Sequence, residues 1–168
     1  MRGAGTHAGV MSTLQYKAID PGRLDAMRGS GADEFGNPWQ QRTAEGWEPL
    51  RCCLRTADEG EDIALISYSP WPLPWGTPWA EAGPVFVCHR RCDGYRTPRE
   101  YPPGLADRHS QLNPFDHEGG RAYEHITFVA PGEDHAAAVA AVMGQPGVAR
   151  LHVRSATAQC FTFEVRRA

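Results

Sequence analysis

The sequence is poor in lysine and asparagine and has no excess of positive charge. Lys17 is its only lysine, and Asn37 and Asn113 are its only asparagines. The formal net charge is -3, so the chain offers no basic field for nucleic acid or an anionic membrane. This bias, with abundant Ala, Gly and Pro, is typical of a GC-rich bacterial genome. Such a genome inflates arginine, so an arginine here indicates a site only where its neighbours support it.

Long apolar runs are missing as well. Nowhere do 18 apolar residues follow one another, and residues 1–10 lack the apolar centre of an export signal. We therefore expect a cytoplasmic protein that does not bind membranes. Residues 1–12 are expected to form a disordered extension, with Met11 as an alternative start. Residues 13–168 are expected to form one globular domain.

Four catalytic motifs are also absent from the sequence. They are the phosphate-binding loop, the dinucleotide fingerprint, the nucleophile-elbow serine and the His-Glu-x-x-His helix. Phosphoryl transfer, nicotinamide chemistry and zinc hydrolysis therefore lack their usual signatures. The sequence leaves acid-base chemistry without a cofactor, of the isomerase, cyclase or lyase type, or a protein that only binds.

Strand-like patterns recur along the chain. A short helix is expected after Asp20 and a second over residues 132–144, where alanines follow acidic residues. Residues 29–48 have the composition of a long loop. We predict an α+β single domain with a mostly antiparallel sheet, a few helices packed on one side and a C-terminal β-hairpin. The expected strands are 14–19, 63–69, 84–89, 111–115, 122–130, 148–155 and 160–167.

The register of the C-terminal hairpin follows from its apolar pattern. Setting Arg154 opposite Cys160, around a loop at residues 155–159, puts every apolar side chain on one face. Such a polar face is either solvated, with Arg150 paired to Glu164, or part of a site. In this register the polar face holds Arg150, His152, Arg154, Cys160, Thr162 and Glu164.

Four blocks of the sequence resemble one bacterial family. They read PLRCCLRTADEGEDIALISYSP, TPWAEAGPVFV, QLNPFD and VARLHVRSATAQCFTFEVRRA, and they begin at Pro49, Thr77, Gln111 and Val148. Together they resemble the family catalogued as domain of unknown function number 1203. Order and spacing agree from about Arg23 to the C-terminus. The resemblance implies no established activity.

The resemblance maps particular positions. Pro49 and Arg51 match a Pro-Cys-Arg of the family, with Leu50 in place of the cysteine, and Trp79 stands where members tend to have Tyr. Gln159 replaces a family glycine. If the family's chemistry used the missing thiol, this chain has lost it or moved it to Cys52 or Cys53. The C-terminal family motif corresponds to His152, Val153, Ala156, Cys160 and Phe161.

The five cysteines are an odd number in an expected reducing compartment, which argues against a disulfide framework. Cys88, His89 and Cys92 have a chelating spacing, and Cys52 with Cys53 would complete a zinc site. Strand alternation places Cys88 and His89 on opposite faces, and adjacent cysteines are not a usual chelating pair. We therefore expect no metal, and zinc stays an alternative.

Two other readings use the polar groups near the C-terminus. Cys160 is a candidate nucleophile, with His152 as proton acceptor and Arg154 lowering the thiol pKa; the alternative is a small buried residue. Arg51 and Arg154 are also candidates to hold an anion, with aromatic walls, unless Arg51 and Glu81 pair structurally. The remaining substrate-binding candidates are Tyr68, Trp75, Trp79, Glu81 and Phe115.

The leading prediction is a small-molecule enzyme of bacterial specialised metabolism. Its ligand is expected to be polar or anionic, and the segment 70–83, rich in Trp and Pro, is expected to form a wall or lid. The rival is a protein without chemistry that binds a small molecule, or that uses this segment to dock another chain or a second copy of itself. A homodimer is possible on either reading.

Overall fold

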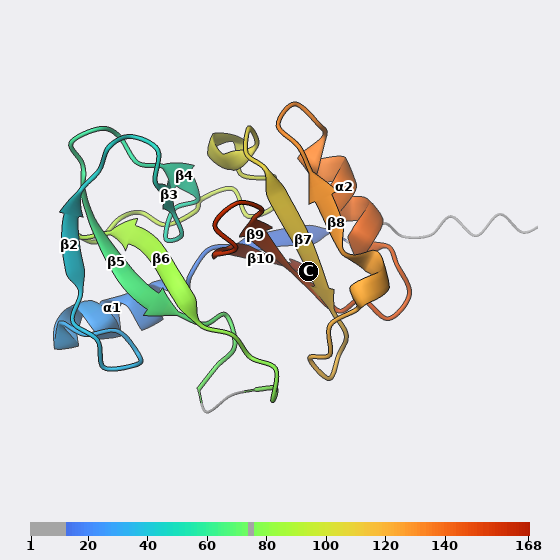
Figure 1. The fold of residues 1–168 in the computed structure, drawn as a ribbon, viewed down its shortest axis with the longest axis horizontal. Coiled ribbons are helices and arrows are strands. Elements are labelled where there is room, and N and C mark those ends of the chain that lie inside the picture. The colour runs from blue at the N-terminus through green and yellow to red at the C-terminus, as the bar shows by residue number, and fades with distance from the viewer. Residues whose placement is uncertain (1–12, 74–75) are drawn as a thin grey trace, which may run out of the picture.

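The computed structural model describes residues 13–73 and 76–168. The predicted extension at residues 1–12 and the candidate Trp75 lie outside the described residues. Two five-stranded sheets lie side by side (Figure 1). The sheet that contains both chain-terminal strands is called the terminal sheet, and the one built from residues 40–88 is called the middle sheet.

The terminal sheet has the strand order β1-β10-β9-β7-β8, and all its described pairings are antiparallel. Helix α2 (His135–Met143) packs on it. Asp134 begins this helix by accepting a hydrogen bond from the backbone N–H of Ala137. The strands are β1 (Leu14–Lys17), β7 (Ser110–Phe115), β8 (Thr127–Val129), β9 (Arg150–Ser155) and β10 (Phe161–Arg167).

The middle sheet has the order β2-β5-β6-β3-β4, and only the short β3–β6 pairing is parallel among its described pairs. Helix α1 (Pro21–Ser30) packs Leu24 and Met27 into its core. Asp20 caps the helix at its start and Gly31, at φ 71°, ends it. The strands are β2 (Gln40–Thr43), β3 (Pro49–Leu50), β4 (Arg55–Thr56), β5 (Asp62–Tyr68) and β6 (Gly83–Cys88).

The predicted fold class is confirmed: the chain is mostly antiparallel β with two α-helices and ends in the β9–β10 hairpin. The strands divide into two sheets instead of one. Each sheet has its own apolar core, and Phe161 of the terminal sheet packs in the core of the middle sheet. No α-helix within residues 13–73 and 76–168 is long and apolar enough to cross a membrane.

The predicted hairpin register is wrong by one residue at Arg154 and by two residues from Val153 to Arg150. Arg154 lies opposite Phe161, and Val153 lies opposite Phe163, because β10 carries an extra residue at Thr162. This β-bulge restores the alternation after Phe161. Phe161 therefore lies on the same face of the terminal sheet as His152 and Arg154. The middle sheet covers this face at Phe161.

Local sequence patterns failed in two regions. Strand β2 lies in the segment expected to be a long loop. The sequence did not predict this strand, because its four residues are all exposed and show no apolar alternation. The expected strand 122–130 begins instead with the 3-10 helix η2 (Tyr123–His125), and only Thr127–Val129 pair with β7. Another 3-10 turn, η1 (Pro103–Leu105), interrupts the irregular stretch before β7.

Candidate functional site

A buried histidine–carboxylate pair lies where the two sheets meet. His152 on β9 is 2% exposed, and its Nε2 lies 3.3 Å from Oε2 of Glu164, the residue opposite it on β10. The rings of Trp71, Phe115 and Phe161 surround the imidazole at centroid distances of 4.6 to 5.5 Å. The predicted polar face is therefore enclosed, and it holds a titratable pair in an aromatic cage.

The charges of this pair follow from its surroundings. Burial lowers the pKa of His152, and the hydrogen bond to Glu164 opposes that effect only in part. Burial would raise the pKa of Glu164, but hydrogen bonds with His152 and Arg166 outweigh it and lower that pKa to about 2. At neutral pH the pair is thus a neutral imidazole donating Nε2–H to a carboxylate. The predicted Arg150–Glu164 ion pair is also present, at 3.7 Å.

An aromatic groove opens next to this pair. Its volume is about 550 Å³, and we call it the anion groove. Trp79 and Tyr123 are its exposed walls, at 64% and 72% exposure. Four of its residues also line a narrow recess that reaches His152, with about 10 Å³ free, room for one water molecule. The groove is lined by Trp79, Ala80, Glu81, Phe115, Gly120, Arg121 and Tyr123.

Two guanidinium groups and one carboxylate form a polar floor between the groove and the recess: Arg121 and Glu81 line both, whereas Arg154 lines the recess alone. Glu81 pairs with Arg154 of β9 and, at 3.2 Å, with Arg121. Burial would raise the pKa of Glu81, but the hydrogen bond from Arg154 and the charges of both arginines lower it. The side chains of Arg154 and Arg121 are 16% and 22% exposed, whereas that of Glu81 is 48% exposed. The two cations are thus built into the floor, and the anion lies on the solvent side.

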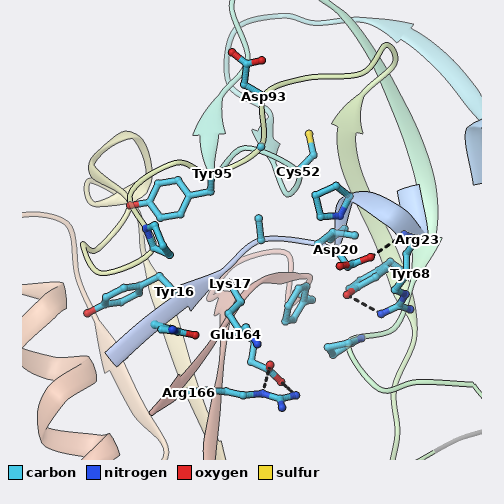
Figure 2. Close-up of a pocket in the computed structure, with 18 residues that line it drawn as sticks. Tyr16, Lys17, Asp20, Arg23, Cys52, Tyr68, Asp93, Tyr95, Glu164 and Arg166 are labelled. Carbon is cyan, nitrogen blue, oxygen red and sulfur yellow. Dashed lines mark hydrogen bonds and ion pairs between the residues drawn. The ribbon is translucent and has the colours of Figure 1, made fainter. Parts of the chain in front are cut away.

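A second cavity of about 460 Å³ is lined by residues of β1 and of the adjacent strand β10 (Figure 2). It is lined by residues from β1, α1, β10 and the loop around Tyr95. Lys17 lies opposite Glu164 in the β1–β10 ladder. Arg23 pairs with Glu34 and donates to the Tyr68 hydroxyl, and Arg166 pairs with Glu164. Its charges are balanced, so it has no preference for an anion.

The side chain of Arg51 binds backbone carbonyl groups and does not line the groove. It is buried, and it donates Nε–H to the carbonyl of Phe161 at 2.8 Å and an Nη1 hydrogen to the carbonyl of Pro49. Burial lowers its pKa to about 10. In the described part of the chain, no carboxylate lies within ion-pair distance of it, so the proposed pairing with Glu81 is absent. Arg51 joins the two sheets.

The candidate nucleophile Cys160 is half-buried and donates its thiol hydrogen to the carbonyl of Ala158 at 3.4 Å. Arg154 donates Nε–H to the carbonyl of Gln159, one residue before it. No hydrogen bond among the described residues joins Cys160 to His152 or Arg154. The thiol thus lies near the polar floor without the geometry of an activated pair.

The structure brings most of the predicted site residues together. Arg51 and Cys160 lie outside the recess. Sequence reasoning missed Arg121, which precedes the expected strand 122–130, and Tyr123, which lies in that expected strand but belongs to η2. The groove shows that they face Trp79 and Glu81 across 40 residues of chain. The recess is lined by six predicted residues, namely Tyr68, Trp79, Glu81, Phe115, His152 and Arg154.

Four of the five cysteines also meet in space. The sulfur atoms of Cys52, Cys53, Cys88 and Cys92 all lie within 4.8 Å of one another. His89 points elsewhere, with its ring 6.4 Å from that of Trp39, as strand alternation predicted. Cys52 and Cys53 come together although adjacent cysteines are not a usual chelating pair, because they belong to a tight turn between β3 and β4 and not to a strand.

Comparison with known proteins identifies a family. A family model described as protein of unknown function (DUF1203) matches residues 47–167. No curated protein and no solved structure matches the chain. The matched range includes β3 to β10, and with them the anion groove, the His152–Glu164 pair and the four cysteines.

Proposed function

We propose from the geometry that this chain, a member of the DUF1203 family, binds a small aromatic or apolar carboxylate in the anion groove. His152 then acts on that ligand by proton transfer. The family description assigns no activity. The observation that carries this proposal is the position of Glu81. A carboxylate on the solvent side already bridges two guanidinium groups fixed in the floor of the groove.

Glu81 occupies the place that a ligand carboxylate would take. Arginine binds carboxylates through paired N–H groups, which adds both energy and orientation. Arg154 and Arg121 outnumber Glu81, so the floor carries one uncompensated positive charge. A ligand that displaces Glu81 gains both guanidinium groups, and it leaves Glu81 free to be solvated.

The walls of the groove suit an apolar body on the ligand. Trp79, Phe115 and Tyr123 line it, and the guanidinium of Arg121 lies 5.5 Å from the Phe115 ring centre and 5.8 Å from that of Tyr123. The groove volume of about 550 Å³ falls in the range of small-molecule sites. Aromatic walls around a charged floor favour aromatic carboxylates over inorganic anions.

Calorimetric titration with benzoate tests the binding step. Wild type should bind benzoate and should bind the neutral isostere benzamide at least about 10-fold more weakly. The double variant Arg121→Gln/Arg154→Gln should lose about 10-fold or more in benzoate affinity. Glu81→Gln should gain affinity, because the guanidinium groups are then free.

A matched control removes the same charge elsewhere. Arg42 and Arg99 are exposed and lie outside the groove, and Arg42→Gln/Arg99→Gln should bind benzoate as wild type does. If both double variants lost benzoate affinity equally, the loss would reflect the change in net charge and not the two arginines of the floor. Equal binding of benzoate and benzamide would reject the anion groove.

The reaction class follows from the His152–Glu164 pair. A neutral imidazole held by a carboxylate is the usual arrangement of a general base, since the carboxylate fixes the tautomer and stabilises the imidazolium. His152 lines the recess beneath the groove. A carboxylate ligand with an acidic C–H bond next to a carbonyl group would present that bond to the recess.

Proton exchange measures this chemistry without knowledge of the natural substrate. In D2O, the methylene protons of phenylpyruvate should exchange faster with wild type than with His152→Gln, as followed by proton NMR. Benzoate binding by His152→Gln should stay close to wild type. Equal exchange rates with both proteins would remove the catalytic part and leave a binding protein.

We place this activity in the cytoplasm of a bacterium, in small-molecule metabolism. The arginine-rich, lysine-poor composition supports a GC-rich bacterial source. The five cysteines are an odd number, which argues against a disulfide framework and fits a reducing compartment. Neighbouring genes for biosynthetic enzymes would support this placement.

A further inference from the structure

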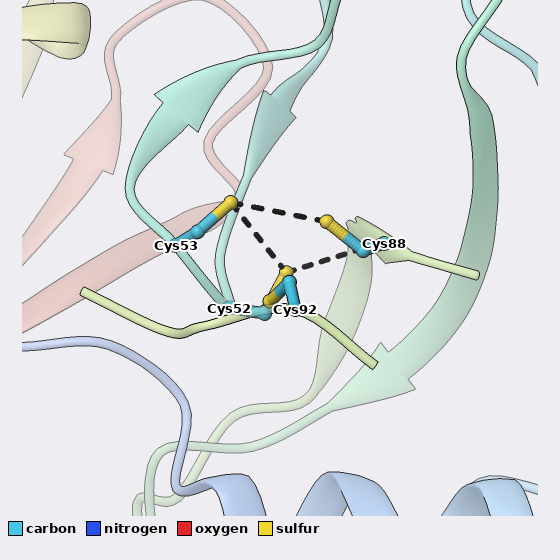
Figure 3. A group of neighbouring side chains, drawn as sticks. All are labelled: Cys52, Cys53, Cys88 and Cys92. Carbon is cyan, nitrogen blue, oxygen red and sulfur yellow. Dashed lines mark hydrogen bonds between the residues drawn. The ribbon is translucent and has the colours of Figure 1, made fainter. Parts of the chain in front are cut away.

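The four-cysteine cluster lies in the middle sheet, apart from the anion groove (Figure 3). Cys52 and Cys53 come from the turn between β3 and β4, Cys88 is the last residue of β6, and Cys92 follows in the next loop. Three separate pieces of backbone thus direct sulfur atoms at one point.

The distances between the sulfur atoms suit a single metal ion. The Cys53 and Cys88 sulfurs lie 3.8 Å apart, and those of Cys52 and Cys53 lie 3.9 Å apart. Zinc bound tetrahedrally at about 2.3 Å from each sulfur requires sulfur–sulfur distances of about 3.8 Å. A disulfide requires about 2.05 Å. An iron–sulfur cluster inserts sulfide ions between its cysteines and holds them farther apart.

We propose that Cys52, Cys53, Cys88 and Cys92 bind one zinc ion as a closed tetrathiolate site. Four protein ligands leave no open position, which is typical of structural zinc. Binding forms four Zn–S bonds and releases the remaining thiol protons to solvent, with no change in oxidation state. The ion would join the β3–β4 turn to the end of β6 and the loop after it.

Backbone N–H groups around the cluster support thiolates. The N–H of Cys88 donates to the sulfur of Cys52 at 3.1 Å, and the N–H of Gly94 donates to the sulfur of Cys92. Such bonds favour the charged form of the ligand and orient it.

The charges nearby are mixed. A zinc tetrathiolate carries two negative charges, and the guanidinium of Arg55 interacts favourably with Cys53 and Cys88. Glu61 lies 3.8 Å from the Cys88 sulfur, close enough to accept its thiol hydrogen, and it is itself bound by Arg55 at 2.6 Å. When the Cys88 proton leaves on metal binding, Arg55 stays bound to Glu61 and offsets part of the repulsion between the carboxylate and the thiolate.

The turn that carries the adjacent cysteines has an unusual backbone. Leu54 follows Cys53 with φ 54°, a left-handed conformation that is unfavourable for a residue with a side chain. Its side chain is buried in the core of the terminal sheet. Such conformations persist where surrounding contacts hold them, and they gather at ligand sites. This turn lets two neighbouring cysteines serve one ion.

Metal analysis tests the site, and the fifth cysteine supplies the control. Protein expressed with zinc and purified under reducing conditions without chelator should contain about one zinc per chain. Cys88→Ser and Cys92→Ser should lose it at least 10-fold, whereas Cys160→Ser should keep it. Less than a tenth of a zinc per wild-type chain, stoichiometric iron, or retention by both serine variants would overturn the proposal.

A second measurement covers the case in which the serine variants fail to fold. Metal-free wild type titrated with Co2+ should develop the thiolate-to-cobalt charge-transfer bands and the strong visible bands of a tetrahedral site, saturating at one equivalent. A weak octahedral spectrum, or two disulfides found by thiol counting in freshly purified protein, would overturn the site. The anion groove does not depend on either result.

Discussion

At the scale of single residues, His152 is a titratable side chain in a buried position, where burial disfavours its charged form. A buried imidazole ring among Trp71, Phe115 and Phe161 resists protonation. It is compatible with folding because Glu164 accepts its Nε2–H. The family resemblance includes His152, but sequence alone left open whether its face was solvated. The covering sheet, built from distant segments, decides that question.

This burial predicts a pH dependence of stability. Since the folded-state pKa of His152 is lowered, the unfolded chain takes up a proton first as the pH falls below about 6.5. His152 therefore stabilises the fold above that pH and loses stability below it, by at most about 1.4 kcal/mol per pH unit. Urea unfolding at pH 7.5 and 5.5 should show a smaller loss for His152→Gln than for wild type.

The exposed His117 supplies the control for that measurement. His117→Gln should keep the wild-type difference between the two pH values. Glu164 acts at lower pH: its pKa of about 2 means that its stabilising charge is lost only between about pH 4.5 and 2. An unchanged pH dependence in His152→Gln would show that His152 is solvated.

The backbone at Gln159 explains why the family pattern has glycine at this position. It stands where the resemblance places glycine, and its φ is 60°, a left-handed conformation that glycine adopts without strain. Gln159→Gly should be nearly neutral, because relief of strain offsets the greater entropy of the unfolded chain. Gln159→Val should lose about 1 to 2 kcal/mol of unfolding free energy, since a β-branched residue disfavours this conformation. Equal stability of both variants would contradict the assigned turn.

At the scale of elements, strand β10 shows what an apolar pattern can and cannot predict. Alternation located the hairpin and its loop, and it placed Leu151, Val153 and Phe163 correctly in one core. It could not predict the bulge at Thr162, because a bulge depends on which face the second sheet covers. The Phe161 side chain packs in the core of the middle sheet, not in the core of the terminal sheet to which its strand belongs.

The position of Phe161 can be tested by a pair of double-mutant cycles. Its ring centre lies 5.5 Å from that of Tyr68 on β5. The cycle of Phe161→Ala with Tyr68→Ala should give a coupling of about 0.5 to 1.5 kcal/mol in chemical unfolding. The cycle with Val153→Ala, on the opposite face of β9, should give a coupling near zero. The reverse result would restore the register expected from the apolar pattern.

At the scale of the whole molecule, both proposed sites depend on contacts that a linear pattern does not contain. The fold class, the hairpin and six residues of the recess could be predicted from local patterns and family blocks. The convergence of Cys52 and Cys53 with Cys88 could be raised from the sequence only as an alternative, because it rests on the parallel pairing of the two-residue strand β3 with β6. The expected homodimer and the docking role of residues 70–83 stay predictions.

Zinc at the cysteine cluster should also stabilise the whole fold. Removing a closed zinc site typically costs several kcal/mol, which corresponds to a fall in melting temperature of about 10 °C for a chain of this size. Differential scanning calorimetry with and without a strong chelator should show this fall in wild type and in Cys160→Ser. Cys92→Ser should melt at a lower temperature and should not respond to chelator. A chelator effect equal in all three proteins would contradict the assignment.

The most direct test of the proposed function is an NMR titration with benzoate that follows the histidine ring signals. His152 lines the recess beneath the anion groove, whereas the buried His135 is held by Tyr101 and Ala130 on the far side of the terminal sheet. We predict that the His152 signals shift and saturate with benzoate while the His135 signals stay in place. Unchanged His152 signals at benzoate concentrations that saturate binding would contradict the account.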